Sequence, residues 1–259
     1  MSSPTSTKLA PPTYIDGRVR RRYFIVFMLQ MWLSLIPASF LAYWFFLPAE
    51  ETFAFRGLIS QWWEMPEWVF IILVPLMIAL IYVVTVIWTA VLTKLHLSFL
   101  NAMHKPIEGV FMRDMRDKDY VYWNRRNYAR LFLNWLLYTP PFTAMKTYFA
   151  YRFLGAKIGE NSDINHCWVS QEFVSIGKDV KIGQSAAVHS FMYENDKLLV
   201  AQIEIRDGAL LGPQCVVFPG TVIGENSELG GGTWNHPFSI YEDNCVYNGL
   251  PAVLVKKKE

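Results

Sequence analysis

The feature that most constrains the fold is a six-residue periodicity between about residues 158 and 252. An aliphatic residue recurs at every sixth position, with one interruption after which the phase resumes: Ile158, Ile164, Ile176, Ile182, Val188, then Ile205, Leu211, Val217, Ile223 and Leu229. A small or β-branched residue follows four positions later at most steps: Ser162, Val180, Ala186, Ala209, Cys215, Thr221, Ser227 and Thr233. Short hexapeptide repeats are the sequence signature of a parallel β-helix, in which three strands and their corners make one triangular coil.

Neither an amphipathic helix nor an alternating strand keeps a period of six. A β-sandwich of short strands is the alternative, although a sandwich has no reason to hold this register. Position 170 breaks the pattern, because Ser170 stands where an aliphatic residue is expected and Val169 lies beside it. We therefore predict a stack of coils over residues 158–259, with the aliphatic side chains pointing inward.

Hydrophobic residues make up 53% of the 259 residues and aromatic residues 16%, which exceeds the content of an ordinary soluble domain. Two apolar runs, 23–47 and 68–92, contain no charged residue. Each is long enough to cross a bilayer core of roughly 30 Å at a rise of about 1.5 Å per residue. Pro37 and Pro75 lie inside them and should kink the helices. We predict a transmembrane helical hairpin over residues 23–93; a buried hairpin of a soluble protein is the alternative.

Positive charges flank the two runs, whereas the segment between them is acidic. The flanking cations are Arg18, Arg20, Arg21 and Arg22 before the first run and Lys94, Lys105 and Arg113 after the second; the acids between them are Glu50, Glu51, Glu64 and Glu67. By the positive-inside rule, both termini and the repeat domain lie in the cytosol, and the protein is integral to the cytoplasmic membrane. Residues 1–22 are predicted to be a disordered basic segment. Three tryptophans should lie at the outer headgroups: Trp62, Trp63 and Trp68.

Residues 94–157 form an aromatic and basic connector between the membrane and the coil. Its apolar run 131–138, which is followed by Pro140 and Pro141, is too short to span a bilayer. We predict an interfacial amphipathic segment or a helix packed on the membrane side of the coil, and a plain core helix is the alternative. The connector places the repeat domain close beneath the bilayer.

The repeats break once, between Val188 and Ile205, and the inserted loop begins with His189. Loops that leave a rigid scaffold tend to carry binding and catalytic groups. Glu194 and Asp196 lie within reach, and a histidine oriented by a carboxylate is the usual general base for an amine or hydroxyl. We predict His189 as the base and Glu194 or Asp196 as its orienting acid. The alternative is a polar loop that has no catalytic or binding function.

The register also groups residues from different coils. With eighteen residues per coil and the insertion removed, His189, Phe218 and His236 occupy one column. At a strand spacing of about 4.8 Å, the two histidines would lie about 10 Å apart, so they could line one groove but could not share a metal within a chain. His166 lies in another column, and we predict a structural role for it.

The final repeats depart from the pattern. Trp234 and Phe238 are predicted either to cap the coil or to form a stacking surface for a ligand. The turn at Asn248 and Gly249 exposes backbone, and the lysines at 256–258 could bind phosphates or anionic lipid, or be a solvated tail.

Three cysteines, Cys167, Cys215 and Cys245, are an odd count without paired spacing, which argues against disulfides or a zinc site. Cys215 takes a small-residue corner position, so we expect it to serve packing. The net charge of +2 gives no reason to expect a nucleic-acid partner.

The repeats, the histidine-bearing insertion and the closing turn 248–252 resemble the left-handed β-helix hexapeptide acyltransferases. The resemblance implies a left-handed coil, active sites between the coils of a homotrimer, coenzyme A as donor and a loop histidine, here His189, as general base. The closing turn departs from the family's Gly-Asn-Pro-Ala-basic pattern, because its order is altered and Val253 replaces the basic residue. The candidate substrate-binding residues are Phe218, Trp234, Asn235, His236, Asn248 and Gly249.

From about residue 68 onward, the chain is also similar to the membrane-bound C-terminal region of ε-poly-lysine synthetase and related non-ribosomal peptide synthetases. The shared features are an apolar helix, an aromatic and basic connector, the Leu154–Gly159 entry to the coil, and a histidine followed by acidic residues. The synthetase fuses three such units with six spans, so the resemblance implies a homotrimer of this chain. It also implies peptide-bond formation from an aminoacyl thioester on a carrier protein.

The function predicted from these features is an integral-membrane acyl- or aminoacyltransferase. Its co-substrate would be a pantetheine thioester, on coenzyme A or a carrier protein, with no permanently bound cofactor or metal. One alternative is a non-enzymatic trimeric scaffold that docks a synthetase or carrier protein. Another is a zinc-dependent hydratase like the γ-class carbonic anhydrases, which needs three converging ligands and one open position.

Overall fold

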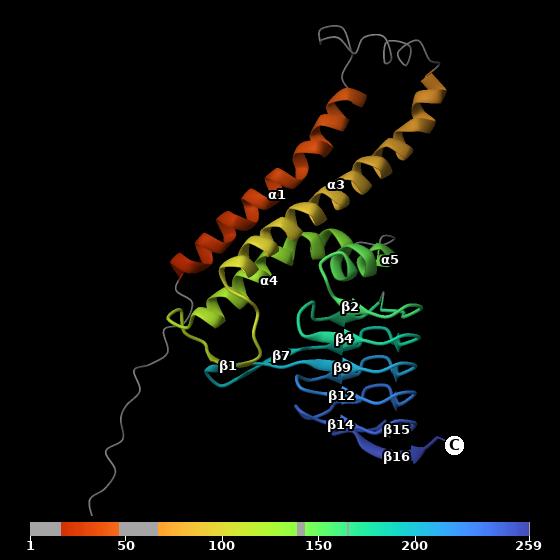
Figure 1. Cartoon of the computed structure of the whole chain (residues 1–259). Coiled ribbons are helices and arrows are strands. Elements are labelled where there is room, and N and C mark those ends of the chain that lie inside the picture. Colours follow the sequence, from red (N-terminus) through yellow and green to blue (C-terminus); the bar gives the residue numbers. More distant parts are fainter. Residues whose placement is uncertain (1–16, 47–66, 139–142, 165, 259) are drawn as a thin grey trace, which may run out of the picture.

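The computed structural model describes residues 17–46, 67–138, 143–164 and 166–258. Two long helices lean over a stack of short strands, and a third helix lies between them and the stack (Figure 1). The predictions for most of the N-terminal segment, the acidic loop with Trp62 and Trp63, and the Pro140-Pro141 pair lie outside the described residues.

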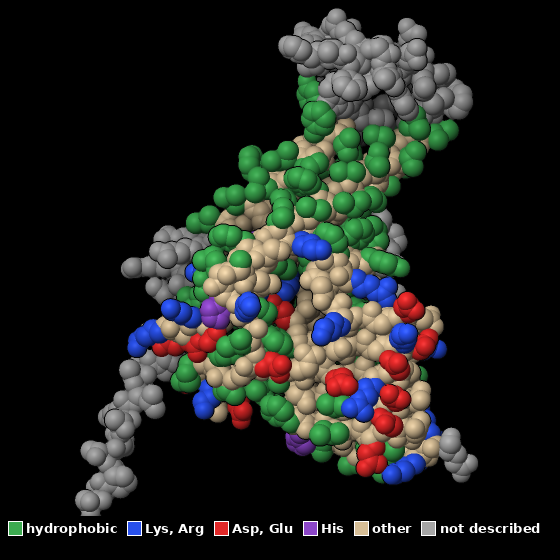
Figure 2. All heavy atoms as spheres, in the orientation of Figure 1, with side chains coloured by type: hydrophobic (Ala, Val, Ile, Leu, Met, Phe, Trp, Pro, Cys, Tyr) green, Lys and Arg blue, Asp and Glu red, His purple; other side chains and the backbone are tan. Residues whose placement is uncertain are grey.

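The two apolar runs form α1 (Gly17–Phe46) and α3 (Glu67–Met103), with Pro37 and Pro75 inside them. Two stretches of these helices, Tyr23–Tyr43 and Ile72–Met103, are long and apolar enough to cross a membrane by length and composition. Their outward faces are covered with hydrophobic side chains (Figure 2). The helix α3 continues beyond residue 92, where we placed the end of the apolar run, because nothing between 93 and 103 stops a helix: the segment holds no proline or glycine.

Polar side chains join these helices to the rest of the chain. The amide of Gln30 on α1 donates to the Thr93 hydroxyl at 3.0 Å and to the Ala129 carbonyl at 2.9 Å. Tyr82 on α3 donates its hydroxyl to the Leu136 carbonyl at 2.6 Å. These hydrogen bonds fix the register between the otherwise apolar helices, because sliding one helix along another would leave their polar groups unpaired in an apolar contact.

The connector is mainly the helix α4 (Lys118–Leu137), which begins where Asp117 accepts hydrogen bonds from the backbone N–H groups of residues 119 and 120. It stacks on α1 through Tyr23 and Tyr128, whose ring centroids lie 4.8 Å apart. Two short helical segments, α5 (Thr143–Lys146) and the π-helix η1 (Thr147–Arg152), then lead into the first strand. A helix does lie between the apolar helices and the coil, whereas its interfacial position at a membrane stays a prediction.

The strands of the repeat region form three sheets that make the sides of the coil. One has the order β2 (Lys157–Ile158), β4 (Val174–Ile176), β9 (Ile203–Ile205), β12 (Val222–Ile223) and β14 (Ile240–Tyr241). A second has β5 (Lys181–Ile182), β10 (Leu210–Leu211), β13 (Glu228–Leu229), β15 (Cys245–Asn248) and the antiparallel β16 (Val253–Lys257). The third has β3 (Trp168–Val169), β6 (Ala187–Val188) and β11 (Val216–Val217). The predicted stack of parallel coils is confirmed, and its left-handed sense stays a prediction.

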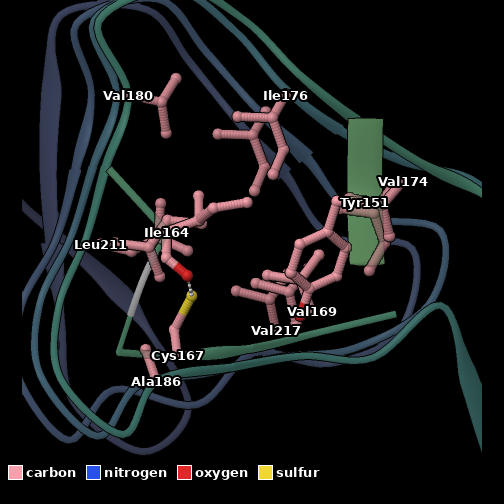
Figure 3. Close-up of a cluster of buried hydrophobic side chains, with 14 of the residues drawn as sticks. Tyr151, Ile164, Cys167, Val169, Val174, Ile176, Val180, Ala186, Leu211 and Val217 are labelled. Atoms are coloured by element: carbon pink, nitrogen blue, oxygen red, sulfur yellow. Dashed lines mark hydrogen bonds between the residues drawn. The ribbon is translucent and has the colours of Figure 1, made fainter. Parts of the chain in front are cut away.

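The periodic aliphatic residues fill the interior as expected. Side chains from successive coils, such as Ile176, Leu211 and Val217, converge on one column (Figure 3). The column is continuous at one end with α3, α4 and η1, through Val86, Phe132 and other side chains. Helices and coil therefore share one hydrophobic core.

The irregularity at position 170 has a simple explanation. Val169 takes the inward position and pairs with Val188, so the step before it is one residue short and the next one residue long. Ser170 lies outside the core, and its hydroxyl accepts a hydrogen bond from the Ser190 backbone N–H at 3.1 Å.

Candidate functional site

The insertion between the two blocks of repeats is a β-hairpin of β7 (Phe191–Glu194) and β8 (Lys197–Val200). A third strand, β1 (Gly109–Met112) from the connector, pairs antiparallel with β8. Beneath this sheet, Trp123 of α4 packs with Leu198 and Val200. The insertion is therefore held against the helices at the edge of the coil. This contact fixes the position of the segment that follows β6.

His189 is the first residue after β6, and its backbone N–H donates to the Val217 carbonyl at 2.9 Å. Its half-buried ring meets Phe191 edge to face, with the ring centroids 5.8 Å apart. The atom Nδ1 is enclosed and has no hydrogen-bond partner among the described residues. Burial lowers the pKa of His189, so the imidazole is neutral at neutral pH and can accept a proton.

The predicted orienting acids lie elsewhere. Glu194 is exposed at the end of β7, where it pairs in register with Lys197, and Asp196 occupies the hairpin turn. An extended strand advances about 3.3 Å per residue, so the hairpin carries both carboxylates away from the ring. No hydrogen bond joins either carboxylate to the His189 ring among the described residues, so the orienting role of Glu194 or Asp196 stays a prediction.

The predicted column of His189, Phe218 and His236 is confirmed by the strand register. Val188 pairs with Val217, and Val216 forms a bridge with Trp234, which aligns the three following positions. Asn235, one residue before His236, is buried, and its side-chain oxygen accepts from the Phe218 backbone N–H at 2.9 Å. The amide of Asn235 also donates to the His236 carbonyl at 2.8 Å, so this side chain serves the coil itself.

Trp234 and Phe238 do not cap the coil, because β14, β15 and β16 follow them; both rings are exposed on its sides. The last coil is closed by Tyr241 and Tyr247, whose rings pack edge to face with centroids 4.5 Å apart. The sequence did not identify this cap, because tyrosines in the aliphatic positions look like breaks in the repeat.

The closing turn is tied to the coil. The side-chain oxygen of Asn248 accepts from the Thr233 hydroxyl at 3.1 Å and from the Gly249 backbone N–H at 2.8 Å. Of the terminal lysines, Lys257 pairs with Glu242 at 3.0 Å and Lys258 with Glu228 at 3.5 Å.

The three cysteines are buried and free, as expected for packing residues. Burial raises the pKa of Cys167 and of Cys215 to about 12, so neither thiol is a nucleophile near neutral pH. Within the part of the chain that the structure describes, no three His, Cys, Asp or Glu side chains gather as metal ligands.

A second set of polar residues was missed from the sequence. A pocket of about 250 Å³ lies between α4, the segment around Lys146 and the first coil. Arg130 and Glu172 line it, and Ser190 and Phe191 form the wall beside His189. The signal that could have found it is the placement of Arg126 and Arg130 on the buried face of α4, among aromatic and aliphatic residues.

No family model matches the chain. Over 126 residues it is 25% identical to YvoF of Bacillus subtilis (strain 168), a protein provisionally named an acetyltransferase. The matched segment covers 47% of this chain and 72% of YvoF.

Among solved structures, the matches include the hexapeptide-repeat acetyltransferase VCA0836 of Vibrio cholerae (21% identity, TM-score 0.37) and the maltose O-acetyltransferase of Clostridium difficile 630 (21%, 0.36). The N-acyltransferase AntD of Bacillus cereus, in complex with a dTDP-amino sugar and coenzyme A, is another (15%, 0.33). These matches cover 39% of this chain and 62%, 58% and 59% of those chains, so this chain spans about three fifths of their length. The proteins that this chain is similar to are thus acetyl- and acyltransferases, and the relation to ε-poly-lysine synthetase stays a prediction.

Proposed function

We propose that the protein is a membrane-bound acyltransferase that uses His189 as its general base. It would move an acyl or aminoacyl group from a thioester of coenzyme A or a carrier protein to an amine or hydroxyl, and peptide-bond formation is one such reaction. The similarity to YvoF supports the reaction class. The observation that carries the proposal is the neutral, half-buried His189 whose Nδ1 has no partner among the described residues.

The chemistry needs no covalent enzyme intermediate. The neutral imidazole takes a proton from the acceptor N–H or O–H as the acceptor attacks the thioester carbonyl. A C–N or C–O bond forms, the C–S bond breaks, and the proton passes from His189 to the leaving thiolate. Backbone N–H groups of the coil would stabilise the tetrahedral oxyanion.

We further propose that the working form is a homotrimer with six spans. The ring of His189 is only half buried, so a neighbouring copy could meet its open edge, although its Nδ1 is enclosed within the chain. The candidate substrate-binding residues would then be those that lie along the histidine column and in the closing turn: Phe218, Trp234, His236, Asn248 and Gly249. Glu194 and Asp196 on the hairpin could act only across such an interface.

The membrane placement is supported by the surfaces of α1 and α3. Only 17% of the most apolar window of each helix is buried, whereas the core helix of a soluble protein is mostly buried. The large side chains Phe24, Trp32 and Leu76 are all more than half exposed. Orientation with the coil in the cytosol rests on the flanking charges in the sequence.

The test is to purify the protein in detergent, measure its mass, and follow the release of free thiol from a panel of acyl and aminoacyl thioesters. Loss of a general base should lower the rate by about 10² to 10⁴-fold, so His189→Ala should be nearly inert. His166→Ala, at an exposed corner in another column, is the matched control and should keep wild-type activity. A His189→Ala protein with full activity would refute the mechanism, and a wild-type trimer inert to every donor would favour the docking scaffold.

A further inference from the structure

The pocket beside His189 contains an unbalanced group of charges. Arg126 Nε and Arg130 Nη2 both donate to the same oxygen of Glu172, at 2.8 and 2.6 Å. Lys146 completes the group, and its ammonium donates to the Cys167 carbonyl at 3.0 Å. Arg126 and Arg130 are 2% and 7% exposed and share this single carboxylate out of water, and Lys146, which is 4% exposed, lines the same pocket.

Several polar atoms in this group are enclosed and unpaired. They are Arg126 Nη1, Arg130 Nε and Glu172 Oε2, none of which has a hydrogen-bond partner among the described residues. Asp119, the other carboxylate whose field reaches Arg126, is paired with His104 at 3.1 Å. Buried cations that share one counter-charge are costly, so a bound anion at this position would stabilise the arrangement.

The surroundings favour a ligand that has both an anionic and a donor part. Arg130, Lys146 and Glu172 all line the pocket, and Glu172 Oε2 has no donor among the described residues. Lys146 also lies 4.8 Å from the Tyr138 ring centroid and 5.8 Å from that of Trp168, so aromatic faces enclose the cation. The pocket volume of about 250 Å³ exceeds what one water needs.

The pocket also lies at the level where the apolar helices meet the coil. One wall of the pocket is formed by the α4 residues Asn127, Leu131 and Asn134. The other face of α4 packs on α1 and α3 (Figure 1). Lys and Arg side chains are seen at this level, between the hydrophobic helices and the mixed surface of the coil (Figure 2). A lipid headgroup in the adjacent leaflet would be near this position if the helices span the membrane as proposed above.

We propose that this pocket binds a phosphate-type anion bearing a hydrogen-bond donor, and that the anion is the headgroup of a membrane lipid. Arg130 and Lys146 hold the phosphate oxygens, and Glu172 Oε2 accepts from a hydroxyl of the headgroup. Anion binding is independent of the transferase activity, whereas the lipid as its source rests on the proposed membrane placement.

The test measures binding without any thioester. Native mass spectrometry of the detergent-purified protein would compare phosphatidylglycerol, which carries a net negative charge and hydroxyl donors, with phosphatidylcholine, which has neither. Arg130→Gln and Lys146→Gln should each weaken phosphatidylglycerol binding by about tenfold or more, because each removes a charge-assisted hydrogen bond. Arg116→Gln is the control, since this cation is exposed on the same connector and pairs only with Asp114 at 3.7 Å among the described carboxylates.

The other arm uses inorganic phosphate, followed as a rise in melting temperature over chloride at equal ionic strength. If phosphate binds and phosphatidylglycerol shows no preference over phosphatidylcholine, the anion site stands and the lipid source is overturned. If neither ligand binds, or Arg116→Gln loses as much affinity as the pocket variants, the site itself is overturned. Should Arg130→Gln fail to fold, Lys146→Gln and phosphate competition on the wild type decide. A protein that binds the lipid but turns over no thioester contradicts only the proposed function.

Discussion

Glu172 offers the most direct test of the charge arrangement on α4. The carboxylate oxygen Oε1 accepts from both Arg126 and Arg130, and all three side chains are nearly buried, with 3%, 8% and 12% of the two arginines and the glutamate exposed. Glu172→Gln keeps the size and one acceptor oxygen but removes the negative charge. The two buried arginines then face no carboxylate at this position.

The size of the effect follows from the lost negative charge. Both hydrogen bonds keep a charged guanidinium donor, so what Glu172→Gln removes is the attraction between opposite charges. Breaking a buried ion pair costs about 3–5 kcal/mol, and the retained amide oxygen offsets part of that. We expect a loss of about 2–4 kcal/mol in the free energy of unfolding. For a chain of this size that lowers the melting temperature by roughly 4–16 °C.

The assay is thermal unfolding in detergent, with Glu204→Gln as the matched control. Glu204 accepts from Arg206 at 3.0 Å, but both side chains are more than 40% exposed, so solvent screens that pair and its loss should not move the melting temperature measurably. The deficit of Glu172→Gln should shrink in phosphate buffer, because the anion would replace the missing charge. Equal shifts in melting temperature for Glu172→Gln and Glu204→Gln would show that the buried ion pair stabilises the protein no more than the exposed one.

Two further predictions concern the coil. Gly220→Ala should destabilise the protein by about 1–3 kcal/mol more than Gly232→Ala in thermal unfolding, since both glycines have positive φ but only the new Cβ at 220 meets a neighbour, the ring of Phe238; equal costs would contradict this packing. The thioester turnover of the wild type should rise with pH through an apparent pKa below the ordinary histidine value of 6.5, because burial lowers the pKa of His189 and only the neutral ring accepts a proton. The same sign means that protonation favours the unfolded chain, so His189 costs stability as the pH falls below about 6.5. A pH profile with its acidic limb above 6.5 would remove His189 from the role of base.

The coil could be predicted because its information is local. Each step repeats the same inward aliphatic and the same small corner residue, and positions such as Ile205, Leu211 and Val217 are all buried where the period places them. Even the column of His189, Phe218 and His236 follows from counting, since stacked coils leave little freedom in register. The break in the phase at Ser170 was also visible in the sequence, and the coil accommodates it with one short step followed by one long step.

The hairpin could not be predicted in the same way, because its partner is distant in the sequence. β1 pairs with β8 across about ninety residues, and Phe111 and Trp123 cover the far side. Sequence proximity of Glu194 and Asp196 to His189 suggested an orienting acid, whereas strand geometry carries them to the tip. The sequence shows the arginines of α4 only as part of an aromatic and basic connector, because nothing local indicates that a residue about forty positions later, Glu172, would pair with them in a buried position.

The boundary at residue 157 therefore separates two sequence patterns rather than two cores. The interior of the coil runs without a break from Tyr247 at one end to Tyr151 and Phe132 at the other, where α3 also packs. Closing that end with helices removes the exposed edge that the first coil would otherwise present. It also places the buried arginines beside β3 and the turn after it. Because β3 pairs with β6, the strand that leads to His189, the pocket and His189 are held by neighbouring strands. A ligand held by Arg130 and Lys146 would thus lie against the wall that Ser190 and Phe191 form beside the proposed base.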